Sequence, residues 1–211
     1  MSTRHQIKKL IKLVFLVLAL PLFLLYRVVS LAGNKDSVFQ SFSQLLSLIP
    51  GKIGVYLRAA FYKLACTHTS DNISVSFLTL LSHQDTTLGE GIYIGPGCNI
   101  GKCSIGDNTL LGSGVHVLSG SRQHNFTDPE TPIKEQGGHF EKIHIGRDCW
   151  LGNQAIVMVS LADKTLVAAG SVVTRSAEPG AILAGNPAKV IGNRLTPKTE
   201  SAKKEADSDG Q

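Results

Sequence analysis

A six-residue repeat organises the chain between Leu88 and Thr174. An aliphatic residue returns at almost every sixth position, and a glycine often follows it. The heads of these repeats are Leu88, Ile94, Ile100, Ile105, Leu111, Ile145, Leu151, Val157, Leu161, Val167 and Val173. A period of six matches neither the 3.6 residues of an α-helix nor the two residues of an ordinary strand. It predicts a chain that forms a short strand, turns and repeats, so that three sides make a triangular coil.

Small or slim residues recur four positions after the heads, where they would fill the corners of such a coil. These residues are Ile92, Cys98, Thr109, Val115, Cys149, Ala155, Thr165 and Ser171. The step from Ile100 to Ile105 is one residue short, which predicts a tightened corner. The expected fold is an all-β core, a parallel β-helix of hexapeptide repeats, preceded by apolar and amphipathic α-helices.

The cysteines show no pairing pattern. They are Cys66, Cys98, Cys103 and Cys149, and no two form a CxxC motif. We interpret them as reduced packing residues in a reducing compartment. A metal site or disulfides would be the alternative, but no ligand spacing supports either.

Positive charge is concentrated at the N-terminus. The whole chain has a net charge of +5, yet residues 1–63 hold nine Lys/Arg and one acidic residue, against twelve and fifteen in residues 64–211. A nucleic-acid reader would carry its charge on the folded domain, so no nucleic acid partner is expected. Basic residues beside apolar runs favour an anionic membrane surface.

Residues 1–65 are predicted to form a membrane-associating helical segment. An apolar stretch runs from Leu10 to Leu31, with three interruptions at Lys12, Pro21 and Arg27. Its central part, Leu13 to Tyr26, is short of the ~20 residues that a straight spanning helix needs. A span, a re-entrant segment that turns at Pro21, and a cleaved signal peptide all stay open.

Two amphipathic helices should follow, over residues 36–49 and 53–64. In the first, Asp36 or Ser37 is expected to cap the start. Its predicted apolar face consists of Val38, Phe39, Phe42, Leu45, Leu46 and Ile49, and its polar face includes Ser43. We interpret these helices as part of a monotopic membrane platform. The alternative is that they pack against the open end of the coil.

The remaining chain divides into a β-helix domain at 66–192 and a polar tail at 193–211, which we expect to be disordered. A lead-in coil is predicted at 72–83, and the chain is expected to leave the coil over residues 176–191.

The repeats are interrupted by a polar loop, residues 119–142. A loop of this length inside a compact repeat domain usually carries function.

Four motifs accompany the repeat: HNFTDPETPI in the loop, then CWLG, AAGSVVT and AGNPAKVI. Together they resemble the left-handed β-helix acyltransferases over residues 85–192, and are most similar to sugar O-acetyltransferases of bacterial polysaccharide biosynthesis. The first 65 residues more weakly resemble the leader of a membrane-attached subgroup. The resemblance implies a left-handed coil, a homotrimer, and acetyl-CoA as cosubstrate between neighbouring subunits. No metal is expected.

The resemblance implies that His124 in the loop is the general base. A neutral imidazole suits the deprotonation of a sugar hydroxyl near neutral pH. Asp128 is the candidate that orients this ring, and Asn125 is a candidate for hydrogen bonding to the substrate. An ordinary loop histidine is the alternative interpretation of His124.

Acyl-CoA would lie along the coil surface. Trp150 is the candidate wall for the pantetheine arm or thioester, with Gly152, Ala168 and Gly170 along the same groove. The segment Asn186-Pro187-Ala188-Lys189 resembles the family's adenine and phosphate end, where Lys189 would supply a point charge. Coverage of a coil face and turn geometry are the alternative roles.

The predicted activity is transfer of an acetyl group from acetyl-CoA to a hydroxyl of a glycan or lipid-linked sugar, at the cytoplasmic face of a bacterial inner membrane. Three alternatives stay open. One is a γ-class carbonic anhydrase-like zinc enzyme that uses His116, His139 and His144. The others are N-acyl transfer to an amino sugar and a non-enzymatic membrane scaffold.

Overall fold

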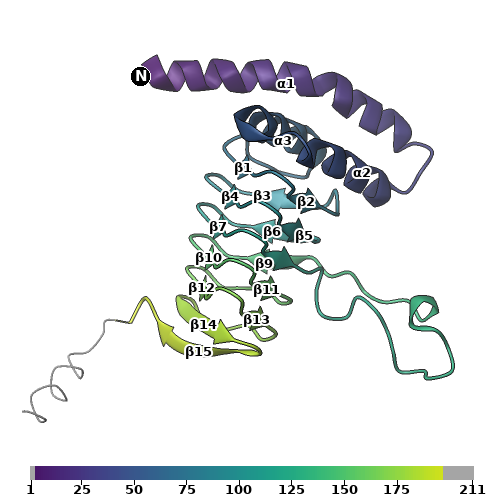
Figure 1. Cartoon of the computed structure of the whole chain (residues 1–211), viewed down its shortest axis with the longest axis vertical. Helices are drawn as coiled ribbons and strands as arrows, with labels where there is room; N and C mark the ends of the chain where they lie inside the picture. The colour runs from purple at the N-terminus through teal and green to yellow at the C-terminus, as the bar shows by residue number, and fades with distance from the viewer. Residues whose placement is uncertain (1–2, 197–211) are drawn as a thin grey trace, which may run out of the picture.

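The computed structural model describes residues 3–196, which form three helices above a tall stack of short strands (Figure 1). The predicted tail therefore lies mostly outside the described residues. The helices are α1 (Thr3–Val29), α2 (Lys35–Ser47) and α3 (Gly51–Ala65). They supply the N-terminal helices that the predicted fold class includes.

The strands form three sheets, one on each side of a triangular coil. Face A holds β1 (Ser74–Val75), β4 (Tyr93–Ile94), β7 (Leu110–Leu111), β10 (Trp150–Leu151), β12 (Leu166–Val167), β14 (Ala181–Gly185) and β15 (Ala188–Asn193). Face B holds β2 (Leu80–Leu81), β5 (Asn99–Ile100), β8 (His116–Val117), β11 (Ile156–Val157) and β13 (Val172–Val173). Face C holds β3 (Thr87–Leu88), β6 (Cys103–Ile105) and β9 (Ile143–Ile145), and a bridge to Leu161 extends it.

Strands on a face pair in parallel with the strands of the coils above and below. Ile94 pairs with Leu111, for example, and Leu111 pairs with Leu151 across the loop insertion. The second residue of each two-residue strand points inward and is buried. This stack confirms the predicted fold class, a parallel β-helix of hexapeptide repeats.

The repeat heads fill the interior of the prism. Every head from Leu88 to Val173 is at most 4% exposed. Full burial of such an aliphatic side chain contributes about 1.5–3 kcal/mol. The predicted corner residues, including Thr109 and Thr165, are likewise buried. The Thr109 hydroxyl donates to the Gly146 carbonyl at 2.8 Å and accepts from the Cys149 amide at 3.1 Å, so a corner residue also joins two coils.

The corner between faces B and C is the short one. Ile100 and Ile105 are five residues apart across it, and Val157 and Leu161 are only four apart. Register is kept despite the short step, because Leu88 still pairs with Ile105. In the coil between these two steps, the same corner opens into the loop at 118–142. The insertion thus leaves the stack where the neighbouring turns are tightest.

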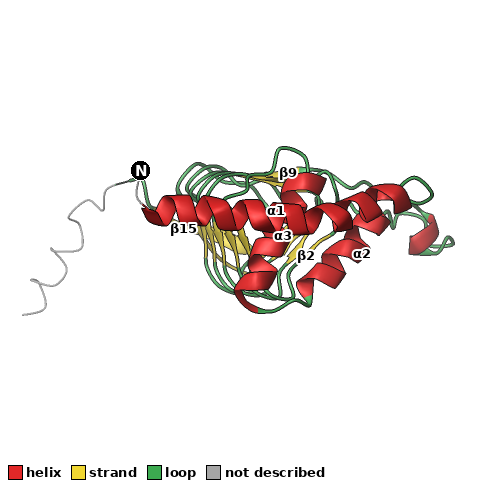
Figure 2. Cartoon of the chain, turned by 90° about the horizontal axis from the view of Figure 1, so that it is seen from above, coloured by secondary structure: helices red, strands yellow, loops and turns green. Residues whose placement is uncertain are grey.

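Helices α1, α2 and α3 cover the first coil, and Figure 2 shows α1 crossing above it. Tyr26 of α1 meets Phe39, Phe42 and Phe61 edge-on, with ring centroids 5.6–6.2 Å apart. α2 also contacts β2 and α3 contacts β1, so the helices do pack on the open end of the coil. α1 continues unbroken through Pro21, and by length and composition alone it could cross a membrane.

Two details of α2 differ from the sequence-based expectation. Its N-cap is Asn34, whose Oδ1 accepts from the amides of Asp36 and Ser37. Predicted face residue Leu45 is exposed, whereas Ser43, assigned to the polar face, is fully buried. The reason is specific: Ser43 Oγ accepts from the Leu81 amide at 2.8 Å and is hydrogen-bonded to the Tyr62 hydroxyl at 2.8 Å.

The lower end of the prism also departs from expectation. The chain was expected to leave the coil over residues 176–191, but β14 adds another rung to face A beside β12. β15 then turns back antiparallel to β14, with a register shift between Ile182 and Leu183. In the lead-in coil, Leu78 lies at a turn with φ 59° and is exposed.

Candidate active site

The loop that carries the candidate base projects from the prism as two facing arms (Figure 1). Backbone hydrogen bonds join the arms at three levels: the amide of Glu141 donates to Ser119 O, that of His139 to Arg122 O, and that of Asn125 to Gly137 O, at 2.8–2.9 Å. These bonds give the base of the loop a defined conformation.

Gln136 ties the outer part of the loop together. Its Nε2 donates to the carbonyl oxygens of Asp128 and Thr131, both at 2.7 Å, and its Oε1 accepts from the Asp128 amide at 3.2 Å. Its own carbonyl accepts from Asn125 Nδ2 at 3.1 Å. The Asn125 amide is therefore used inside the loop, and its proposed contact with substrate would require that bond to be replaced.

His124 lies on the first arm of the loop and is exposed. Its ring approaches Phe140 edge-on at 6.5 Å, and the other neighbour of Phe140 is the ring of His83 at 5.6 Å. A Cβ on Gly138 would collide with the Gln123 carbonyl oxygen, so a glycine is needed for the arms to approach here. The His124 ring forms no hydrogen bond to another described residue, and its exposure leaves both ring nitrogens accessible.

A cleft of about 410 Å³ lies beside the loop, between its base and face B. Gln123 and Phe140 line it from the loop, His116 and Asn99 from face B, and His83 from the lead-in coil. Burial lowers the pKa of His83, so that this imidazole stays neutral at physiological pH. Sequence analysis missed Phe140, His83 and Gln136, because only the folded coil brings these positions together.

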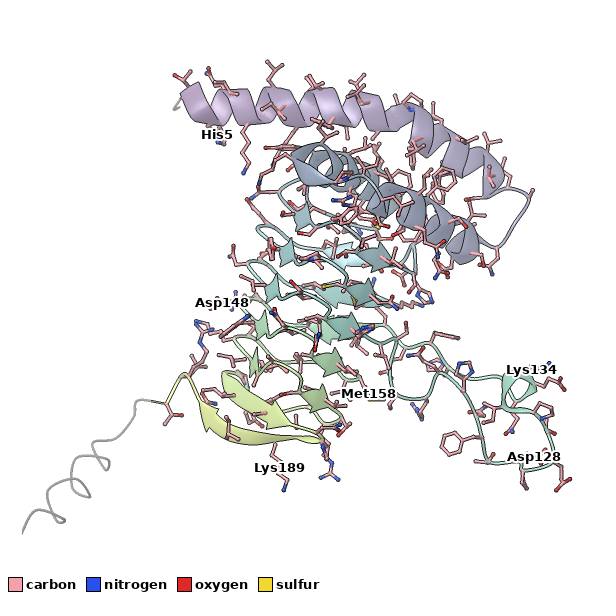
Figure 3. The ribbon with its side chains drawn as sticks, in the orientation of Figure 1. His5, Asp128, Lys134, Asp148, Met158 and Lys189 are labelled. Atoms are coloured by element: carbon pink, nitrogen blue, oxygen red, sulfur yellow. The ribbon has the colours of Figure 1, made fainter. Side chains whose placement is uncertain are left out.

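Asp128 does not contact His124 in this chain. Its carboxylate accepts from Thr131 Oγ1 at 2.7 Å and from the Glu130 amide at 2.9 Å, and these hydrogen bonds lower its pKa. Figure 3 shows it at the far end of the loop. In this structure the Asp128 carboxylate stabilises the loop turn, and its predicted role in orienting the His124 ring stays a prediction.

Trp150 points outward from face A and is 50% exposed. It belongs to a column of outward apolar side chains, one per coil: Tyr93, Leu110, Trp150, Leu166 and Ile182. Tyr93 and Leu110 are 41% and 43% exposed. An apolar column of this height on a parallel sheet is the kind of surface that a partner covers. We call it the face A column.

The other candidates for CoA binding lie on or next to face A. Gly152 and Ala168 follow β10 and β12. A Cβ on Gly152 would stand 2.5 Å from Ala169 N, so close packing of the next coil explains this glycine. Gly170 has φ +68°, so turn geometry explains the other. Asn186 and Pro187 form the turn between β14 and β15, and Lys189 of β15 projects from the lower end (Figure 3).

The base and the acyl-CoA candidates are therefore on opposite sides of one prism. The loop leaves the corner between faces B and C, which is opposite face A in a triangle, and Figure 1 shows it pointing away from β10 and β12. His124 and Trp150 of the same chain cannot face one substrate.

The histidines of the zinc alternative do not converge. His116 lies on β8 of face B and His144 on β9 of face C, while His139 is in an arm of the loop. Within residues 3–196, no group of three or more His, Cys, Asp or Glu side chains is placed to hold a metal ion. The four cysteines are free and buried.

Comparison with known proteins points to one group. Residues 142–175 match the model of the hexapeptide repeat of succinyl-transferase. A probable macrolide acetyltransferase of Lysinibacillus sphaericus is 29% identical over 133 residues, 59% of this chain and 72% of that protein. The putative colanic acid biosynthesis acetyltransferase WcaF of Escherichia coli is 32% identical over 117 residues, 52% of this chain and 59% of that protein.

The fold is shared with a maltose O-acetyltransferase of Clostridium difficile, at a TM-score of 0.64 and 20% identity over 77% of this chain and 89% of the other. Stacked coils, loop and motifs thus define a β-helix protein of the acyltransferase type. In its repeats and its fold, the chain is similar to acyltransferases of the hexapeptide-repeat type.

Proposed function

We propose that this protein transfers an acetyl group from acetyl-CoA to a hydroxyl of a glycan or lipid-linked sugar. The observation that carries the proposal is the exposed imidazole of His124, which lies next to Gln123 and Phe140 of the cleft lining at the loop base. Names of relatives such as the colanic acid and maltose acetyltransferases agree with a sugar acceptor. An acetyl thioester is already activated, so the protein needs to supply only positioning, a base and oxyanion stabilisation.

The reaction would proceed in two steps. His124 removes the proton from the acceptor hydroxyl while its oxygen attacks the thioester carbonyl carbon, and a tetrahedral oxyanion forms. Collapse of this intermediate breaks the C–S bond, and the imidazolium returns the proton to the departing CoA sulfur. One neutral imidazole thus serves as base and then as acid. An amine acceptor would use the same base, so identification of the product separates O- from N-transfer.

The active site would be shared between protomers of a homotrimer. The opposite placement of His124 and Trp150 supports this arrangement, since neither can complete a site alone. The loop of one protomer would reach face A of the next, where Trp150 would flank the thioester and Lys189 the phosphate end of CoA. The same approach would cover the face A column and its exposed apolar surface.

We place the trimer on the cytoplasmic face of a bacterial inner membrane. The outward surface of α1 exposes apolar side chains, among them Leu13, Val17, Leu24 and Val28, while its opposite side packs on α3. Such a helix suits the interfacial layer of a bilayer. The prism would then extend into the cytoplasm, where acetyl-CoA is available.

Incubation with radiolabelled acetyl-CoA and membrane extract, followed by isolation of the labelled product, tests the activity. A labelled glycan or lipid-linked sugar supports the proposal, and absence of any labelled acceptor contradicts it.

The shared site has its own test. His124→Ala chains mixed and refolded with Trp150→Ala chains should regain activity, because some interfaces then hold both native residues. Mixtures no more active than either parent would exclude a shared site.

A further inference from the structure

A groove of about 850 Å³ lies beneath the first half of α1, between α1, α3 and the first two coils of face A. It is separate from the cleft beside His124. Five lysines line it: Lys8, Lys9 and Lys12 from α1, and Lys52 and Lys63 from α3. His5 lies at the same end (Figure 3). We call this feature the lysine groove.

The lysine groove carries surplus positive charge. Its acidic residues are Asp71 and Glu90. Lys12 pairs with Asp71 at 3.2 Å, and Lys8 donates to Asn72 Oδ1 at 3.1 Å. The ammonium groups of Lys9, Lys52 and Lys63 form no ion pair or hydrogen bond within the described part of the chain. Five lysines against two carboxylates attract an anion, and most strongly one with more than one charged oxygen.

One wall of the groove is apolar. Leu13, Leu16, Val55 and Tyr56 line it, and Tyr56 stacks on Phe15 of α1 at 5.3 Å. Leu13 is also one of the exposed apolar residues of α1, so the wall continues onto the outer surface of that helix. A ligand that matches both parts has an anionic head and an adjoining hydrocarbon chain.

We propose that the lysine groove binds the phosphate headgroup of an anionic lipid, with the lipid chain lying against the apolar wall of α1. Charge complementarity supplies the attraction to the phosphate, and the neighbouring apolar surface distinguishes a lipid from a free phosphate or a nucleotide. This site gives the helical platform a selective lipid ligand rather than general affinity for any bilayer.

The groove also points toward the catalytic face. Tyr93 lines it and is the first member of the face A column. If the proposed function holds, a sugar attached through phosphate to a lipid would be held at the membrane end of the face that receives acyl-CoA. This extension rests on the proposed activity, whereas binding of the lipid headgroup does not.

Calorimetric titration of the full chain, without acetyl-CoA, tests the site. Dihexanoyl phosphatidylglycerol should bind at least tenfold more tightly than dihexanoyl phosphatidylcholine, and inorganic phosphate should bind more weakly than dihexanoyl phosphatidylglycerol. Equal affinity for the two lipids would overturn the proposal. Inorganic phosphate that bound as tightly as phosphatidylglycerol would also overturn it, because the apolar wall would then contribute nothing.

A charge-matched pair of variants completes the test. Replacement of Lys9, Lys52 and Lys63 by glutamine should weaken binding of phosphatidylglycerol by about 100-fold. Replacement of Lys35, Lys164 and Arg175 by glutamine removes the same charge outside the groove. The affinity of this control for phosphatidylglycerol should stay within about threefold of the wild-type value. Equal losses in both triple variants would mean that net charge alone attracts the lipid, and would refute a discrete site.

Discussion

The proposed base, His124, has few contacts with the rest of the described chain. Phe140 stands at the edge of its ring, and Gly138 lets the opposite arm pass close by. No carboxylate of this chain accepts from it among the described residues. Any further partner of the ring would therefore come from the substrate or from a second protomer.

Replacement of His124 by alanine should lower kcat by about 10²–10⁴-fold, because the acceptor hydroxyl loses its base. Its exposure means that the fold should be unaffected, as a circular dichroism melt would check. His139→Ala, in the same loop, is the matched control and should keep most of the activity. Full activity in the His124 variant would rule it out as the base.

The cysteines make a second prediction about single side chains. Burial raises the pKa of all four thiols, to about 12 for Cys103. Thiols stay neutral in the fold but ionise near pH 8.5 when the chain unfolds. Native protein at pH 8 should therefore resist iodoacetamide, which attacks thiolates, while denatured protein reacts at four sites. Stability should fall as the pH rises above about 8.5, and rapid labelling of native protein would contradict this account.

Two elements, the loop and the platform, depend on single polar side chains. Gln136 supplies three side-chain hydrogen bonds that fix the outer loop. Arg58, fully buried in α3, donates to the carbonyl oxygens of Leu46, Ile49 and Val75 at 2.8–2.9 Å. It thereby joins the end of α2 to the first strand of face A.

Gln136→Ala should loosen the loop without weakening the prism. We expect faster amide hydrogen exchange over residues 125–131, a lower kcat, and an unchanged melting temperature, because the loop adds little buried surface. Gln154→Ala, on an exposed turn of the stack, provides the control. A fall in melting temperature equal to that of a core variant would show that the loop is structural instead.

Arg58→Met should destabilise the protein by about 3–5 kcal/mol. The methionine fills part of the volume, but three buried carbonyl oxygens lose their donor. Denaturant unfolding followed by circular dichroism measures the change, with Arg122→Met on the loop as the exposed control. A loss below about 1 kcal/mol would mean that water replaces the guanidinium.

The sequence predicted the positions that the six-residue period sets, but not the contacts between segments that are distant in the chain. The heads and corners of the stack follow from a six-residue period, since each must fill the same interior position. Ser43 could not be placed from its helix alone, because its partners Leu81 and Tyr62 lie in other elements. The candidate base was found through its motif, whereas Phe140 and His83 depend on how the loop folds back. The roles of Asp128 and Asn125 in catalysis remain predictions.

At the scale of the whole molecule, the face A column is the proposed interface between copies of the chain. Leu110→Lys would place a charge in the middle of this apolar surface, which a trimer interface would have to desolvate. We expect light scattering after size exclusion to show dissociation of the trimer, together with loss of activity. Ser104→Lys on face C is the control and should leave the mass unchanged. A Leu110→Lys protein that kept the mass of the wild type would exclude face A as the interface.

The two ends of the prism have a further consequence. A stack of parallel strands would ordinarily offer its last rung as a template on which another chain could polymerise. Here α2 and α3 occupy the first rung, and β15 runs antiparallel across the last one, with an irregular register and a lysine on its outer edge. Both features oppose end-to-end growth into filaments, so we expect copies of the chain to associate side by side.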